Sequence, residues 1–131
     1  MSPAESDRSV ILVVEDDHTS QQLMHFFLRK DYDVRLAASV SAAKEQLADG
    51  RVDLILLDFS LEGDEDGLDL ARWLRKVEDV RKNTPIIALT AHAFTTDRDN
   101  ALEAGCDDFL TKPIRQTDLL NVIQKYVSSD E

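Results

Sequence analysis

Short apolar runs alternate with amphipathic segments along most of this chain. Val10–Val14 is an unbroken apolar run, and Val52–Leu57 is a second one that only Asp53 interrupts. Runs of this length with polar residues at their ends are typical of strands that are buried on both faces of a sheet. Shorter strands are predicted at Val34–Ala37, Ile86–Leu89 and Phe109–Leu110.

A segment with the polar and apolar spacing of a helix follows each predicted strand. Asp17 or Thr19 can cap the first helix, in which Leu23, Phe26 and Phe27 recur at helical spacing. The expected helices run from Thr19 to Lys30, from Ser39 or Ser41 to Gly50, from Gly67 through Val77, from Thr96 to Ala104 and from Thr117 to Val127. This alternation predicts a doubly wound α/β domain, with helices on both faces of a parallel sheet.

The length of 131 residues suits a single domain with a substantial core. We expect the folded domain to span residues 9–127, between a flexible N-terminal tail over residues 1–8 and a C-terminal tail over residues 128–131. The single Cys106 excludes an internal disulfide and, beside Ala104 and Gly105, is expected to be a packed core residue and not a nucleophile.

The chain is acidic, with 26 Asp and Glu against 15 Lys and Arg and a net charge of −11. Such a field repels phosphate backbones and anionic membranes, so we expect no nucleic-acid or membrane partner. No apolar stretch approaches the ~18 residues that span a bilayer, and Met1–Arg8 does not resemble a signal peptide. These features, with the low cysteine content, predict a cytoplasmic protein.

Acidic side chains follow two of the predicted strands. Glu15, Asp16 and Asp17 follow the first, and Asp58 follows the third. Because parallel strands all end at the same edge of a sheet, we expect these carboxylates to converge. Clusters of two or three carboxylates suit Mg²⁺ or Mn²⁺, and a carboxylate beside such a metal can accept a phosphoryl group as an acyl phosphate.

Thr90 and Lys112 follow the fourth and fifth strands and complete this set. A transferring phosphoryl group needs a cation and hydrogen-bond donors around its oxygens, and these two side chains can supply them. Each residue taken alone has a simpler interpretation, as a helix cap, a turn residue or a solvated strand end. Their occurrence together, each directly after a strand, favours a phosphoryl-transfer site.

The chain resembles the receiver domain of two-component response regulators over roughly Val10 to Val127. The matching stretches are ILVVEDD, VDLILLD, PIIALTA and AGCDDFLTKPI. The resemblance implies a flavodoxin-like, five-stranded parallel sheet of order 2-1-3-4-5 with five helices. It also implies that the protein takes a phosphoryl group from a histidine kinase or a histidine phosphotransfer protein.

The resemblance assigns the acidic residues to two roles. Asp58 would be the phosphoacceptor. Glu15 and Asp16 would hold Mg²⁺ together with Asp58 and the backbone carbonyl of Ser60.

The remaining residues of the motif would surround the phosphoryl group and respond to it. Thr90 and Ala91 would contact its oxygens, and Lys112 would pair with it. The peptide bond between Lys112 and Pro113 would be cis. Phe109 would be a switch residue that turns inward when Thr90 moves.

Output would come through the face built from the fourth helix, the last strand and the fifth helix, which would bind a downstream protein. The protein would be a monomer or a phosphorylation-dependent dimer. It would not be an enzyme beyond its own phosphorylation and dephosphorylation. Met1 and the short tails favour a stand-alone regulator over a receiver taken from a larger kinase.

One stretch departs from the family pattern. Glu62 stands where a proline is usual, and the acidic loop Phe59–Asp66 is one residue longer before Gly67. The alternative function is therefore a pseudo-receiver that binds partners constitutively. A phosphatase is disfavoured because Ser60 stands where a second Asp would act as general acid, and a flavin-binding protein is disfavoured because the acids after the first strand would repel its phosphate.

Overall fold

A computed structural model describes residues 8–58, 67–91 and 95–127 of the chain. Five parallel strands form one sheet in the order β2-β1-β3-β4-β5. The strands are β1 (Val10–Val14), β2 (Asp33–Ala37), β3 (Leu54–Asp58), β4 (Ile86–Thr90) and β5 (Asp108–Thr111). The predicted fold class and strand order are confirmed. The third strand, predicted at Val52–Leu57, begins and ends later than that in the structure, at Leu54 and Asp58.

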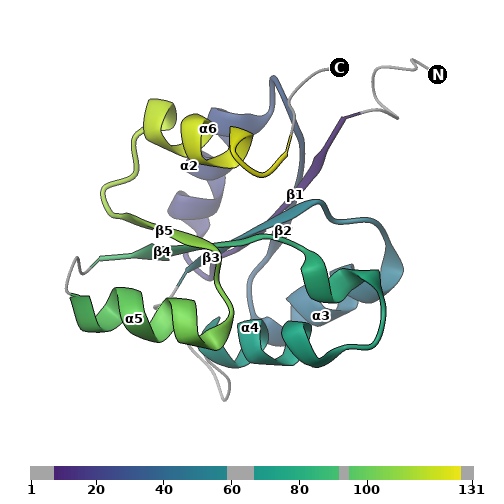
Figure 1. Cartoon of the computed structure of the whole chain (residues 1–131). Coiled ribbons are helices and arrows are strands. Elements are labelled where there is room, and N and C mark those ends of the chain that lie inside the picture. The colour runs from purple at the N-terminus through teal and green to yellow at the C-terminus, as the bar shows by residue number, and fades with distance from the viewer. Residues whose placement is uncertain (1–7, 59–66, 92–94, 128–131) are drawn as a thin grey trace.

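Five α-helices cover the two faces of the sheet in the described part of the chain (Figure 1). They are α2 (His18–Leu28), α3 (Val40–Asp49), α4 (Gly67–Lys76), α5 (Thr95–Ala104) and α6 (Gln116–Gln124). Helices α2 and α6 lie on one face, and α3, α4 and α5 lie on the other. A short 3-10 helix, η1 (Val80–Asn83), precedes β4 and was not predicted by the sequence patterns. None of the helices among these residues is long and apolar enough to cross a membrane.

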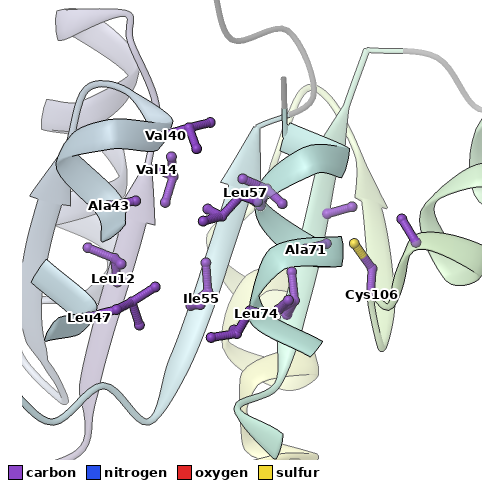
Figure 2. Packing of buried hydrophobic residues seen from close by; sticks show 14 of the residues in the cluster. Leu12, Val14, Val40, Ala43, Leu47, Ile55, Leu57, Ala71, Leu74 and Cys106 are labelled. Carbon is purple, nitrogen blue, oxygen red and sulfur yellow. The ribbon is translucent and has the colours of Figure 1, made fainter. Parts of the chain in front are cut away.

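The central strands β1, β3 and β4 are apolar up to the polar residues that end β3 and β4, because both faces of each strand are buried. In β1, Leu12 and Val14 join the core under α3, α4 and α5, whereas Ile11 and Val13 join the core under α2 and α6. Figure 2 shows the first of these cores, in which side chains of β1 and β3 meet those of α3 and α4. A strand with only one buried face would instead alternate apolar and polar residues.

Cys106 belongs to this first core and is 5% exposed (Figure 2). Burial raises the pKa of its thiol to about 12, so the thiolate does not form at neutral pH. The expectation of a packed core cysteine is confirmed.

Helix α2 buries a different face from the one that its most apolar residues suggest. Leu23 and Phe26 are 45% and 60% exposed, whereas Met24 and Leu28 are buried against the sheet together with Tyr32. Asp17 caps this helix, since its side chain accepts a hydrogen bond of 2.8 Å from the backbone N–H of Ser20. The predicted cap is therefore confirmed at Asp17, while the helical spacing of Leu23 and Phe26 does not mark the core side.

Arg8, which the sequence places in the N-terminal tail, is held by hydrogen bonds. Its guanidinium donates to the backbone carbonyls of Arg29 and Lys30 at the end of α2. Its own carbonyl accepts from Arg51, whose side chain also pairs with Asp53 at 3.0 Å. Arg8 is thus bonded to the folded domain, while the predicted boundaries at residues 9 and 127 stay predictions; the rest of both predicted tails lies outside the described residues.

The two leucines of α2 allow a matched test of its buried face. We expect Leu28→Ala to lower the free energy of unfolding by about 2–5 kcal/mol, because Leu28 is fully buried and its removal leaves a cavity. The same change at the half-exposed Leu23 should cost less than about 1 kcal/mol. Urea unfolding of both variants measures the difference, and equal losses would contradict this placement of the helix.

Candidate functional site

The carboxyl edge of the sheet brings together residues from four strands. Asp58 and Thr90 are the last residues of β3 and β4, Glu15 directly follows β1, and Lys112 directly follows β5. The backbone N–H of Lys112 donates to the carbonyl of Thr90 at 2.7 Å, which joins the ends of β4 and β5. The parallel arrangement therefore produces the convergence that the sequence predicts.

Three carboxylates form a compact cluster at this edge. Ligand oxygens of Glu15, Asp16 and Asp58 all lie within 4.8 Å of one another. Glu15 and Asp58 are only 3% and 1% exposed, and Asp16 is half-buried. Asp17 is exposed and instead caps α2. A group of carboxylate oxygens at this spacing fits the hard-ligand preference of Mg²⁺.

Lys112 supplies a positive charge to this cluster. Its Nζ lies 2.9 Å from Oδ2 of Asp58 and 3.7 Å from Oε1 of Glu15. Burial disfavours the charged ammonium, but the hydrogen bond to Asp58 and the charges of both carboxylates outweigh it and raise the pKa of Lys112. Lys112 is consequently cationic over the physiological pH range and offsets part of the negative charge of the acids.

Glu15 retains a proton more strongly than an ordinary glutamate. Burial first, and then a hydrogen bond to Asp58, raise the pKa of its carboxyl from 4.5 to about 7, while the backbone N–H of Asp17 and the charge of Lys112 oppose the rise. One lysine is thus insufficient to keep the acids of the cluster fully ionised at neutral pH. A further cation would complete the neutralisation.

Two hydrogen bonds that the sequence analysis did not anticipate hold Glu15 in place. The side-chain amide of Gln21 donates to the carbonyl of Glu15 at 2.6 Å, and the backbone N–H of Asp17 donates to its Oε2 at 3.0 Å. Gln21 stands four residues after the cap Asp17, so one helical turn brings it back over the loop. The four-residue spacing from the cap is the feature of the sequence that could have predicted a contact between Gln21 and this loop.

The other predicted residues lie at or beside the cluster. Thr90 is 4% exposed, Ala91 follows it at the surface, and the peptide bond between Lys112 and Pro113 is cis, the isomer that the resemblance implies. Phe109 is half-buried on β5 and packs against the core under α3, α4 and α5. Ser60, whose carbonyl was expected to bind the metal, lies outside the described residues, as does the loop with Glu62.

Comparisons with known proteins identify relatives of this chain. It is 35% identical over 119 residues to hybrid signal transduction histidine kinase G of Dictyostelium discoideum, covering 88% of this chain and 3% of that protein. It is 39% identical over 111 residues to the TorCAD operon transcriptional regulatory protein TorR of Escherichia coli, covering 84% of this chain and 46% of that protein. The chain therefore spans less than half the length of these two relatives.

A solved structure resembles the whole domain. It is the receiver domain of a sensor histidine kinase from Pseudomonas aeruginosa, with a magnesium ion coordinated in its active site cleft. The two chains share 37% identity and superpose with a TM-score of 0.82 over 91% of this chain and 97% of that one. The family described as Response regulator receiver domain also matches residues 11–124. Since that match covers most of the 131 residues, this chain belongs to the response regulator receiver domains of two-component signal transduction.

Proposed function

We propose that this chain is an active phosphoacceptor, in which Asp58 takes a phosphoryl group from a phosphohistidine of a histidine kinase or a histidine phosphotransfer protein. The observation that carries this proposal is the contact of 2.9 Å between Asp58 and Lys112 at a cluster of three acids, two of them buried and one half-buried. Such a cluster is costly to bury, because its like charges repel and lose their hydration. Phosphoryl transfer is a chemistry that needs this combination of a carboxylate nucleophile and cations.

In the proposed step, a carboxylate oxygen of Asp58 attacks phosphorus as the P–N bond to the donor histidine breaks. The hydrogen bond from Lys112 orients the carboxylate, and its ammonium can then pair with the phosphoryl oxygens. Glu15, Asp16 and Asp58 would hold Mg²⁺, which would neutralise charge on the phosphoryl group and on the acids. Thr90, which follows the residue that pairs with Asp58 in the neighbouring strand, would supply a further hydrogen bond from its hydroxyl.

The new charge at Asp58 would then change the surface of the domain. Thr90 and Phe109 lie on β4 and β5, which are adjacent in the sheet, with Thr90 opposite Thr111 and Ala88 opposite Phe109. A movement of Thr90 toward the phosphoryl group would alter the packing next to Phe109, and with it the face formed by α5, β5 and α6. A downstream protein would read that face.

We also propose that the chemistry stays on the chain itself. No second Asp stands two residues after Asp58, where Ser60 occupies the position of a general acid. A phosphoryl group on Asp58 would therefore be lost by slow hydrolysis, and the protein would be a switch and not an enzyme that turns over an external substrate.

Phosphorylation by a small donor tests the proposal directly. Acetyl phosphate with Mg²⁺ should add the mass of one phosphoryl group, and the adduct should be labile in base because it is an acyl phosphate. Asp58→Asn should abolish the adduct. Asp17→Asn should retain it, because Asp17 belongs to the same acidic run but caps α2, and asparagine caps a helix equally well.

Intact-mass spectrometry gives the readout for this comparison. An unchanged mass for the wild-type protein, with donor and Mg²⁺ present, would favour the alternative of a pseudo-receiver. An adduct that persists in Asp58→Asn would place the phosphoacceptor elsewhere.

The pKa of Glu15 predicts how Mg²⁺ binding depends on pH. Below about pH 7 the carboxyl of Glu15 is increasingly protonated, and a proton there competes with the metal. We expect the affinity for Mg²⁺ to fall about tenfold between about pH 8 and about pH 6, as the ionised fraction of a group with this pKa does. Calorimetric titration with MgCl₂ at several pH values measures it.

Two variants serve as controls for this pH dependence. Glu15→Gln should bind Mg²⁺ weakly at every pH in this range and lose the dependence, because it has no proton to exchange there. Asp17→Asn should keep both the affinity and the pH dependence. A wild-type affinity that does not change with pH would contradict the assignment of Glu15 to the metal.

A further inference from the structure

A cavity of about 180 Å³ opens directly beside the acid cluster. Its apolar wall includes Met24 of α2 and Leu89 of β4, which are 4% and 1% exposed, and Leu23 at its rim is 45% exposed. Its other end is polar, since Glu15 and Lys112 also line it. One end of the cavity is therefore shared with the proposed phosphoryl-transfer site, and the rest is apolar.

This arrangement fits a molecule that carries a phosphoryl group at one end and a short apolar group at the other. Lys112 contacts Asp58 and also lines the cavity, so the phosphoacceptor and the cavity share one neighbouring side chain. The leaving group of a donor whose phosphoryl group lies at Asp58 would extend along Lys112 toward the apolar wall. The volume equals about six times the roughly 30 Å³ that a water molecule occupies in the liquid, which is room for a chain of a few carbon atoms. A bound apolar group would also cover part of the exposed Leu23 side chain.

We propose that this cavity is a subsite for the acyl group of small acyl phosphates, and that the chain accepts phosphoryl groups from such donors with a preference for propionyl and butyryl groups over acetyl. This inference rests on the proposed function of Asp58. In the step, a carboxylate oxygen of Asp58 bonds to phosphorus while the P–O bond to the acyl group breaks. The acyl part of the donor leaves as a free carboxylate. The acyl phosphate of the donor is thus exchanged for the acyl phosphate of Asp58, and the step requires no proton or further reactant.

The preference follows from burial of the chain in the cavity. Each methylene group that leaves water for an apolar wall contributes up to about a fourfold increase in the second-order rate constant. A chain longer than the cavity gains nothing further, so the rates should rise from acetyl to propionyl to butyryl phosphate and then level off.

The experiment measures phosphorylation of Asp58 by these three donors with Mg²⁺. Each rate constant is divided by the spontaneous hydrolysis rate of its donor, which removes differences in intrinsic reactivity. The expected result is a butyryl-to-acetyl ratio of several-fold in the wild-type protein. A ratio of one or below would overturn the inference, even though labelling by acetyl phosphate would leave the proposed function intact.

Variants of α2 test whether the cavity causes the preference. Leu23→Ala removes part of the apolar rim, and Ser20→Leu fills space from another lining residue, so both should bring the ratio toward one. Phe26→Ala is the matched control, because Phe26 is 60% exposed on the same helix but does not line the cavity. The same ratio in all four proteins would refute the assignment to this cavity, and failure of every donor to label Asp58 would refute the proposed function and this inference together.

Discussion

The contact between Lys112 and Asp58 is the interaction on which the site depends. Two nearly buried carboxylates, Glu15 and Asp58, lie beside a third at this edge, and such an arrangement is unfavourable unless positive charge enters it. Lys112 offsets part of that cost, but burial and the hydrogen bond to Asp58 still raise the pKa of Glu15 above its ordinary value. The negative charge that remains would favour the binding of a cation, and a metal-bound cluster could in turn tolerate the charge of a phosphoryl group.

The sheet determines which residue can make that contact. Asp58 ends β3, whereas Lys112 follows β5, and β4 lies between them. Strands two positions apart in a sheet are about 10 Å apart, so the cation must cross over the end of β4 to reach Asp58. A lysine, with its four-carbon stem, covers that distance. Thr90 at the end of β4 is buried, and its carbonyl accepts a hydrogen bond from the backbone N–H of Lys112.

Most of the fold could be predicted because the signals for it are local. The run Val10–Val14 and the residues from Leu54 to Leu57 are apolar on both faces, and residues such as Asp17 and Gly105 mark helix ends by their own chemistry. The convergence of Asp58, Thr90 and Lys112 followed from a single topological rule about parallel strands.

What the sequence did not predict depends on tertiary packing. The buried side of α2 is set by how the helix lies on β1 and β3, which favours Met24 and Leu28 over the larger Phe26. The four-residue spacing from the cap brings Gln21 toward the loop, but its bond to the carbonyl of Glu15 also depends on the angle at which α2 leaves that loop. The cavity likewise requires side chains from α2, β4 and the segment after β5 to be placed in space.

Helix α2 therefore has two roles that its sequence separates by position. Its first turn faces the acids: Asp17 caps the helix, and Gln21 fixes the backbone of Glu15. Its next turn presents the apolar side chains of Leu23 and Phe26 to solvent, which is unfavourable. A helix that only covered the sheet would carry polar residues at these positions. Ser20 and Leu23 line the same cavity as Glu15 and Lys112, so the exposed apolar surface of α2 lies next to the acid cluster. Helix α2 thus fixes Glu15 of the acid cluster through its first turn, and its residues Ser20 and Leu23 would select the donor if an acyl group occupies the cavity.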